Sequence, residues 1–193
     1  MRSLAGIGAL LVVLAACGGG GTNAKSTDTS KPATSSSTTS LDTTPPSAAT
    51  GGSTTPVSVA VTHPAAHLVA VRAARQETVD RVVFEFTEQV PGYKVSYVKK
   101  PILDTSGKEV PLSENFVLQF HMQQATGFNL DSGKPTYTGP KQLQPAGTRA
   151  VGEVTQVEDF EGTLTWVAGL KAELPFRVST LTGPPRLVID IPS

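Results

Sequence analysis

The segment Arg81-Val82-Val83-Phe84-Glu85-Phe86-Thr87 decides the fold class, because its inward and outward side chains alternate. In a β-strand successive side chains point to opposite faces, so Val82, Phe84 and Phe86 share one face. The same period of two recurs after residue 65, and no stretch keeps a helical period. The alternation predicts eight strands, at residues 68–75, 81–88, 93–99, 116–122, 149–158, 163–170, 176–181 and 187–191. We therefore expect an all-β fold, a single antiparallel β-sandwich.

Two turns are predicted between these strands. Val90-Pro91-Gly92 is expected to form a tight turn with Gly92 at positive φ, making 81–88 and 93–99 a hairpin. Asp159-Phe160-Glu161-Gly162 is expected to join its two flanking strands in the same way. The connection 123–147 is longer than most loops, so we expect it to hold a short strand or to lie across one end of the sandwich.

Composition divides the chain into three parts. Residues 1–16 contain an apolar run, Leu4 to Leu14, that is too short to span a bilayer and is typical of a signal peptide. Residues 17–65 are rich in Ser, Thr, Gly and Pro and poor in large apolar residues, so we expect a disordered tether. Residues 66–193 hold the predicted strands and are numerous enough to bury a core.

The apolar run ends at the single cysteine of the chain. Leu14-Ala15-Ala16-Cys17 resembles the lipobox of bacterial lipoproteins. The resemblance implies cleavage before Cys17 and attachment of lipid to its thiol. The protein would then be held at the bacterial cell membrane, facing the cell wall. The alternative is an ordinary secretory signal with an unrelated cysteine. One Cys also excludes an internal disulfide and a zinc site built of cysteines.

Several segments of the folded part resemble the AMIN domain. They are Asp80-Arg81-Val82-Val83-Phe84-Glu85-Phe86, Gly92-Tyr93-Lys94-Val95 and Pro184-Pro185-Arg186-Leu187-Val188-Ile189-Asp190-Ile191. Over residues 68–192 the sequence is most similar to the AMIN-like domain of bacterial lipoproteins, through Asp159-Phe160-Glu161-Gly162, Trp166 and Pro175-Phe176-Arg177-Val178. The resemblance implies a small β-sandwich. Because AMIN domains of amidases bind peptidoglycan, it also implies a non-catalytic binding or scaffolding module of the cell envelope. The alternative is a protein–protein adaptor of an envelope assembly that uses a sheet edge or the 123–147 connection.

Three residues are candidates for ligand binding: Arg81, Tyr93 and Arg186. Each arginine opens a β-rich segment that also holds an acid, Glu85 or Asp190. This pattern favours cross-strand ion pairs over a polar ligand site.

The aromatic candidates have two interpretations. Tyr93, Tyr97 and Trp166 carry aromatic faces on which sugar rings can stack. Each shares its strand face with apolar residues, which favours packing in the core.

The sequence contains no motif for catalysis or for a cofactor, such as Gly-x-Ser-x-Gly, His-Glu-x-x-His or a Gly-rich nucleotide loop. Glu158, Asp159 and Glu161 cluster at a predicted turn, where a calcium site or a glycoside-cleaving carboxylate pair is the alternative to solvation. The 16 basic and 16 acidic residues balance, so no nucleic-acid partner is expected. We therefore expect that the protein is not an enzyme and that it binds no cofactor and no metal ion.

Overall fold

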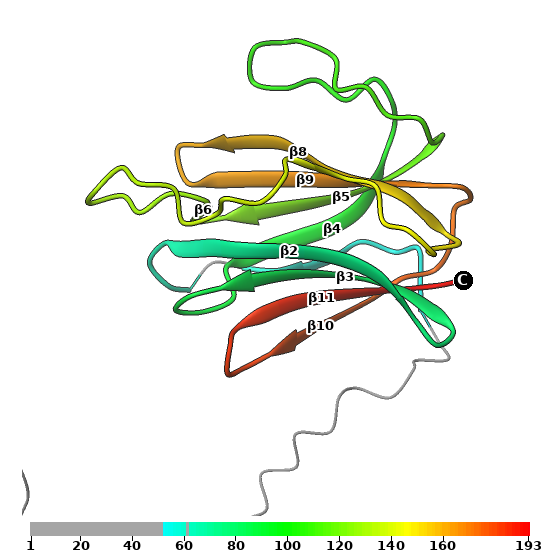
Figure 1. Cartoon of the computed structure of the whole chain (residues 1–193), viewed down its shortest axis with the longest axis horizontal. Coiled ribbons are helices and arrows are strands. Elements are labelled where there is room, and N and C mark those ends of the chain that lie inside the picture. Colours follow the sequence, from blue (N-terminus) through cyan, green and yellow to red (C-terminus); the bar gives the residue numbers. More distant parts are fainter. Residues whose placement is uncertain (1–51, 61) are drawn as a thin grey trace, which may run out of the picture. The chain divides into compact units, whose positions relative to one another are not determined.

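The computed structural model describes residues 52–60 and 62–193. The predicted signal peptide, the lipobox with Cys17 and residues 17–51 of the predicted tether lie outside this range. Within it all regular structure is β, as the alternation predicted, and no helix could cross a membrane. Figure 1 shows how the strands are arranged.

The strands form two sheets, and all eight predicted strands are present. The order in the six-stranded sheet is β1 (Val57–Val59), β4 (Gly92–Val98), β5 (Phe116–Gln123), β9 (Thr163–Leu170), β8 (Val151–Phe160) and β7 (Gln142–Leu143). The order in the five-stranded sheet is β10 (Arg177–Leu181), β11 (Arg186–Pro192), β3 (Val79–Phe86), β2 (Ala66–Gln76) and β6 (Ala125–Thr126). Neighbouring strands are antiparallel, apart from β2 and β6, which pair in parallel.

The core lies between the two sheets and contains the residues that the alternation placed inward. Val82, Phe84 and Phe86 of β3 are all buried. The ring of Phe84 lies 5.2 Å from the ring of Phe120 on β5 and 6.0 Å from that of Trp166 on β9, measured between centroids. These tilted and edge-to-face contacts connect the sheets at the centre of the core.

The predicted hairpin of residues 81–88 and 93–99 is wrong, because β3 and β4 lie in different sheets. Both sides of β3 are occupied, by β2 and by β11, so β4 pairs with β1 and β5 instead. Gly92 has no positive φ; it is the buried first residue of β4. The segment around Pro91 therefore carries the chain from one sheet to the other.

The second predicted hairpin, between β8 and β9, is confirmed. Phe160 pairs with Thr163 across the turn. The two turn residues, Glu161 and Gly162, have φ values of 48° and 76°. Two consecutive positive φ angles are typical of a type I′ turn, whose twist matches that of the strands it joins.

The predicted tether is too long at its C-terminal end. Val57–Val59 forms β1 on the edge of β4, and Ser53 pairs with Phe176, the residue before β10. A methyl group at position 52 would lie 2.9 Å from the carbonyl oxygen of Phe176, so glycine permits this close approach. Composition did not predict these contacts, because a three-residue strand in a Ser/Thr-rich stretch has too few apolar residues to be recognised.

The connections after β4 and β5 also carry structure. From residues 99–115, Ile102, Val110 and Leu112 pack on the outer face of the six-stranded sheet, against Val117 and Val167. Figure 1 shows this loop above β8 at the top of the view. The 123–147 connection holds β6 and β7, which confirms that it contains short strands. The loop over the six-stranded sheet shields part of its outer face from solvent.

The sandwich has two ends. At the Ser53 end, Ser53 pairs with Phe176 close to the start of the described chain. At the His67 end, backbone hydrogen bonds join His67 to Thr87, Phe86 to Pro185 and Ala125 to Gly162. In Figure 1 the turns of the His67 end lie on the left and the C-terminus lies on the right.

Candidate functional site

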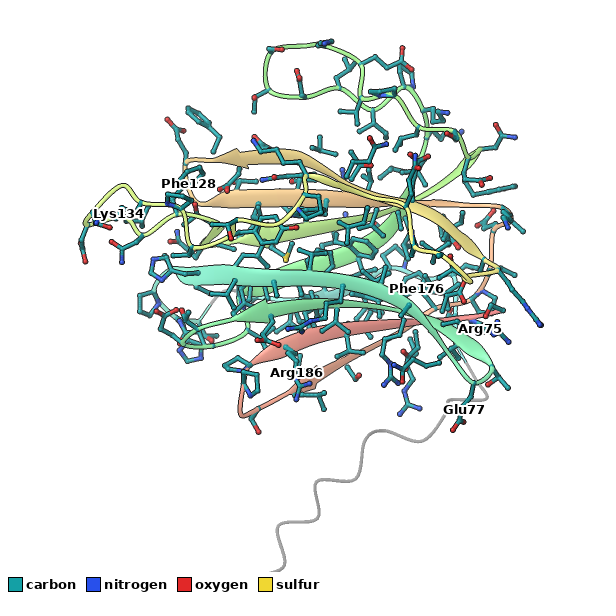
Figure 2. All side chains as sticks on the ribbon, in the orientation of Figure 1. Arg75, Glu77, Phe128, Lys134, Phe176 and Arg186 are labelled. Atoms are coloured by element: carbon teal, nitrogen blue, oxygen red, sulfur yellow. The ribbon has the colours of Figure 1, made fainter. Side chains whose placement is uncertain are left out.

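The three candidate ligand-binding residues do not form one site. Arg81 on β3 and Arg186 on β11 lie on the outer side of the five-stranded sheet, since their strand neighbours Val82 and Leu187 face the core. Tyr93 on β4 lies on the inner side of the other sheet, in register with Met122 of the core. The arginines and the tyrosine therefore belong to separate surfaces, and Figure 2 labels Arg186 on the outer side of its sheet.

Arg81 forms the cross-strand ion pair that the sequence predicted. Its Nε and Nη2 donate to the two carboxylate oxygens of Asp190 at 2.6 and 2.8 Å. The two residues are opposite each other in the β3–β11 register, and both side chains are largely buried. The hydrogen bond to Asp190 raises the pKa of the Arg81 guanidinium, while burial opposes it. Arg81 is thus already bound to a carboxylate and positions β3 against β11.

Arg186 does not form the ion pair with Glu85, although the two residues are opposite in the register. Glu85 instead accepts a hydrogen bond from Arg72 on β2 at 2.8 Å. The Nε of Arg186 donates to the carbonyl oxygen of Pro184 at 3.3 Å. Arg186 therefore has no acidic partner in the part of the chain that the structure describes.

Four arginine side chains lie on the outer side of the five-stranded sheet. This arginine face consists of Arg72, Arg81, Arg177 and Arg186, with the two acids Glu85 and Asp190. Glu85 and Asp190 are paired with Arg72 and Arg81. Arg177, which is exposed, has no ion pair among the described residues, like Arg186. Four positive charges and two negative charges leave a net charge of +2, so the face is suited to an anionic ligand.

Tyr93 borders a groove at the His67 end, between the edge strands β1 and β10. The groove contains two adjoining cavities of about 240 and 500 Å³ that share His63, Val90 and Thr180 in their walls. Tyr93 lines the smaller cavity, and burial raises the pKa of its phenol. We call this space the edge groove.

One polar wall of the edge groove is held by Glu88. Its carboxylate lies 3.0 Å from Nδ1 of His67 and accepts a hydrogen bond from the Thr87 hydroxyl. Burial raises the pKa of Glu88, but the hydrogen bonds from Thr87 and His67 outweigh it and hold the pKa below its usual value. The wall therefore carries a negative charge at neutral pH.

Tyr97 and Trp166 are structural. The Tyr97 hydroxyl donates to the carbonyl oxygen of Leu174 at 2.7 Å and accepts from its N–H at 3.0 Å. Trp166 is fully buried, and the ring of Tyr137 lies edge-on to it at 5.6 Å. The interpretation as core packing is confirmed for Trp166, and the three aromatics do not form a common sugar-stacking platform.

In the acidic cluster at the β8–β9 turn, Asp159 serves the fold. Asp159 accepts a hydrogen bond from the backbone N–H of Gly127 at 2.9 Å, which fixes the start of the 127–135 loop. His121 on β5 is opposite Thr165 of β9, with Nδ1 3.2 Å from the hydroxyl oxygen of Thr165, and Thr165 separates it from Glu158 on β8. Within residues 52–60 and 62–193, no three His, Cys, Asp or Glu side chains are placed to hold a metal ion.

Asp80 has a structural role that the motifs in the sequence do not indicate. Its Oδ2 accepts hydrogen bonds from the backbone N–H groups of Arg149, Ala150 and Val151, at 2.8, 2.6 and 3.0 Å. Its Oδ1 accepts from the Ser193 hydroxyl at 3.0 Å. The side chain is fully buried and joins β3 to the start of β8 in the other sheet. The alternation along β3 could have indicated this role, because Asp80 is two residues before Val82 and therefore points inward with the core residues of the strand.

Comparison with protein families gives one match. The model of the AMIN-like domain matches residues 66–193. The chain belongs to the AMIN-like domain family. Comparison with curated proteins and with solved structures gave no match.

Two of the segments that resemble the AMIN domain lie together in this AMIN-like domain, whereas residues 92–95 are in β4 of the other sheet. Residues 80–86 are in β3 and residues 186–191 are in β11, which pair along their whole length. The pairing places Arg81 opposite Asp190 and leaves Asp80 at the Ser53 end, where it reaches the other sheet. These three polar residues of the motif therefore stabilise the sandwich, whereas Arg186 remains available for a ligand.

Proposed function

We propose that this AMIN-like domain is a non-catalytic binding module of the bacterial cell envelope, which binds peptidoglycan through the arginine face. The observation that carries the proposal is the pair Arg177 and Arg186 on neighbouring strands of one sheet, neither of which has an acidic partner within residues 52–60 and 62–193. Peptidoglycan stem peptides present carboxylates, and a guanidinium binds a carboxylate through two parallel hydrogen bonds. Family membership supports a module without catalysis, because AMIN-like domains are generally non-catalytic.

Binding to peptidoglycan is tested by reversing the two free charges. We expect the variant Arg177→Glu with Arg186→Glu to bind purified peptidoglycan about tenfold more weakly, since both guanidiniums become repulsive carboxylates. The measurement is the fraction of protein that sediments with peptidoglycan, using the chain from Gly18 onward.

The matched control reverses two exposed lysines elsewhere, Lys108→Glu with Lys134→Glu, which changes the net charge equally. Figure 2 labels Lys134 on the loop at the His67 end. Equal loss of binding in both double variants would mean that peptidoglycan responds only to total charge, and the arginine face would not be the site.

We propose further that Cys17 carries lipid and holds the protein at the extracytoplasmic side of the cell membrane. The lipobox residues Leu14, Ala15 and Ala16 precede it, and 34 residues lie between Cys17 and Gly52. A flexible segment of this length has an end-to-end distance of about 35 Å, which is enough to hold the domain off the lipid surface.

The anchor is tested with Cys17→Ser. We expect this variant to be absent from the membrane fraction or to keep its leader, because serine offers no thiol for the lipid. The measurement is the distribution between membrane and soluble fractions, with the mass of the mature N-terminus. Normal processing and full retention in the membrane fraction would contradict the lipobox.

An adaptor between envelope proteins is the second candidate function. It is supported by three exposed apolar side chains at the His67 end: Phe128 and Leu130 in the 123–147 connection, and Phe160 at the β8–β9 turn. The hydrogen bond from Gly127 to Asp159 brings the two loops together. Reproducible cross-linking in cells from position 128 to one envelope protein, with unchanged sedimentation of the arginine variant, would favour the adaptor over peptidoglycan binding.

A further inference from the structure

The strand β10 is an edge strand, and its contacts with β11 and with Ser53 determine which of its backbone groups face the open side. Phe176, directly before β10, donates to the carbonyl oxygen of Ser53 at 3.0 Å and accepts from the N–H of Ser53 at 3.2 Å. In an antiparallel ladder both backbone groups of a residue point to one side, and the side alternates along the strand. Since Phe176 points away from β11, Val178 and Thr180 do so too.

Four backbone groups are therefore left on this edge, the N–H and the C=O of Val178 and of Thr180. Among the described residues none of them has a hydrogen-bond partner. Arg177, Ser179 and Leu181 face the opposite way and bond to β11. Figure 1 shows β10 as the lowest strand of the view, with no strand beyond it.

Space lies beside the Thr180 end of this edge. Thr180 lines both cavities of the edge groove, and Val59 and His63 lie on the other wall. β10 contains no Lys, no Pro and no bulge, so its edge is protected only by its length of 5 residues and by the charge of Arg177. A row of free backbone groups beside an open groove is a template for strand addition.

The side chains next to the edge indicate the chemistry of the guest. Arg177 is exposed on the outer side of β10 and has no ion pair among the described residues. Gly52 follows Ser53 toward the place opposite Arg177, so the outward residue of a guest strand would lie opposite Ser179, on the diagonal to Arg177 and within reach of its long side chain. An acidic residue there would form the missing cross-strand pair.

We propose that the open edge of β10 binds an extended segment of a partner protein, added antiparallel to β10 in line with Ser53 and carrying an acidic residue opposite Ser179, within reach of Arg177. The pair formed by Ser53 and Phe176 is the first step of the same ladder. This inference deepens the adaptor function and does not depend on peptidoglycan binding. Its test separates the two, because strand addition uses the backbone of Thr180 and the arginine face uses side chains.

The test measures amide hydrogen exchange in the chain from Gly18 onward. The probe is a synthetic seven-residue peptide of alternating Thr and Val with Asp at its centre. At ten times its dissociation constant the peptide is expected to slow exchange of the Val178 and Thr180 amides by about tenfold. The amides of Arg177 and Ser179 are expected to exchange slowly with and without peptide, because they are hydrogen-bonded to β11. No change at the Val178 and Thr180 amides up to millimolar peptide overturns the proposal.

Two variants make the test specific. Thr180→Pro removes only an N–H that faces the open edge, so the fold is retained and peptide binding weakens about tenfold. Thr180→Val keeps the N–H and retains binding. Arg177→Glu is expected to reverse the preference from the peptide with Asp to one with Lys at its centre. Equal binding of Thr180→Pro and Thr180→Val would overturn strand addition, whatever the peptidoglycan result.

The chain's own residues before Gly52 are the competing occupant of this edge. If the Val178 and Thr180 amides exchange as slowly without peptide as those of Arg177 and Ser179, the tether already fills the edge. That result would also overturn the proposal.

Discussion

Phe84→Ala is expected to lower the free energy of unfolding by about 3–5 kcal/mol, because it removes a large ring from the centre of the core. Phe84 is fully buried and contacts the aromatic rings of Phe120 and Trp166, which belong to the opposite sheet. The surrounding strands are hydrogen-bonded on both sides and cannot close the cavity. The measurement is urea unfolding followed by the fluorescence of Trp166, the one tryptophan of the chain.

The control for this prediction is Val83→Ala. Val83 directly precedes Phe84 on β3, so its side chain lies on the outer face of the sheet, where it is half-buried. Its truncation is expected to cost less than about 1.5 kcal/mol, since the lost contacts are few and no closed cavity forms. A loss below about 1 kcal/mol for Phe84→Ala would mean that the inner and outer faces of β3 had been exchanged.

Asp80→Asn is expected to destabilise the domain by about 2–4 kcal/mol, the second largest effect. The carboxylate accepts three backbone N–H groups at one oxygen and the Ser193 hydroxyl at the other. Arg75 lies 3.8 Å from that second oxygen. An amide is neutral and presents an NH₂ where an acceptor is needed, so the backbone donors of residues 149–151 lose their charged partner.

The same carboxylate gives the stability a defined pH dependence. Burial raises the pKa of Asp80, but the hydrogen bonds from Val151, Ala150, Ser193 and Arg149 outweigh it and hold the pKa below its usual value. A carboxyl whose pKa is lowered by folding stabilises the protein above its unfolded pKa of about 4, and this contribution is lost as the pH falls through the folded value.

The urea midpoint of the unmodified chain should therefore fall more steeply below pH 4 than that of Asp80→Asn. The hydrogen-bonded Glu88 titrates in the same acidic range, because its pKa is also lowered. Its contribution is common to both proteins, so the difference between the two profiles reports Asp80. Parallel acid profiles would contradict the proposed role of the carboxylate.

The structure also explains why one candidate arginine is available to bind a ligand and the other is not. Arg81 and Arg186 occupy similar sequence contexts, each near an acid on a β-rich segment. Arg81 is opposite Asp190, so its charge is used within the sheet. Glu85 has arginines on both neighbouring strands and pairs with Arg72, which leaves Arg186 without an acidic partner among the residues that the structure describes. Register decides which arginine can bind a ligand, and register is not visible in one sequence.

The sequence by itself determined the all-β class, the eight long strands, their inward faces and the β8–β9 turn. Alternation of side chains is a local property of one strand, and Val82, Phe84 and Phe86 show it without reference to any neighbour. Only the tertiary structure decided that β3 and β4 separate into two sheets, that Val57–Val59 joins the sandwich and that Asp80 connects the sheets. Each of these depends on which strand occupies which edge, and that choice is made by contacts between residues far apart in the chain.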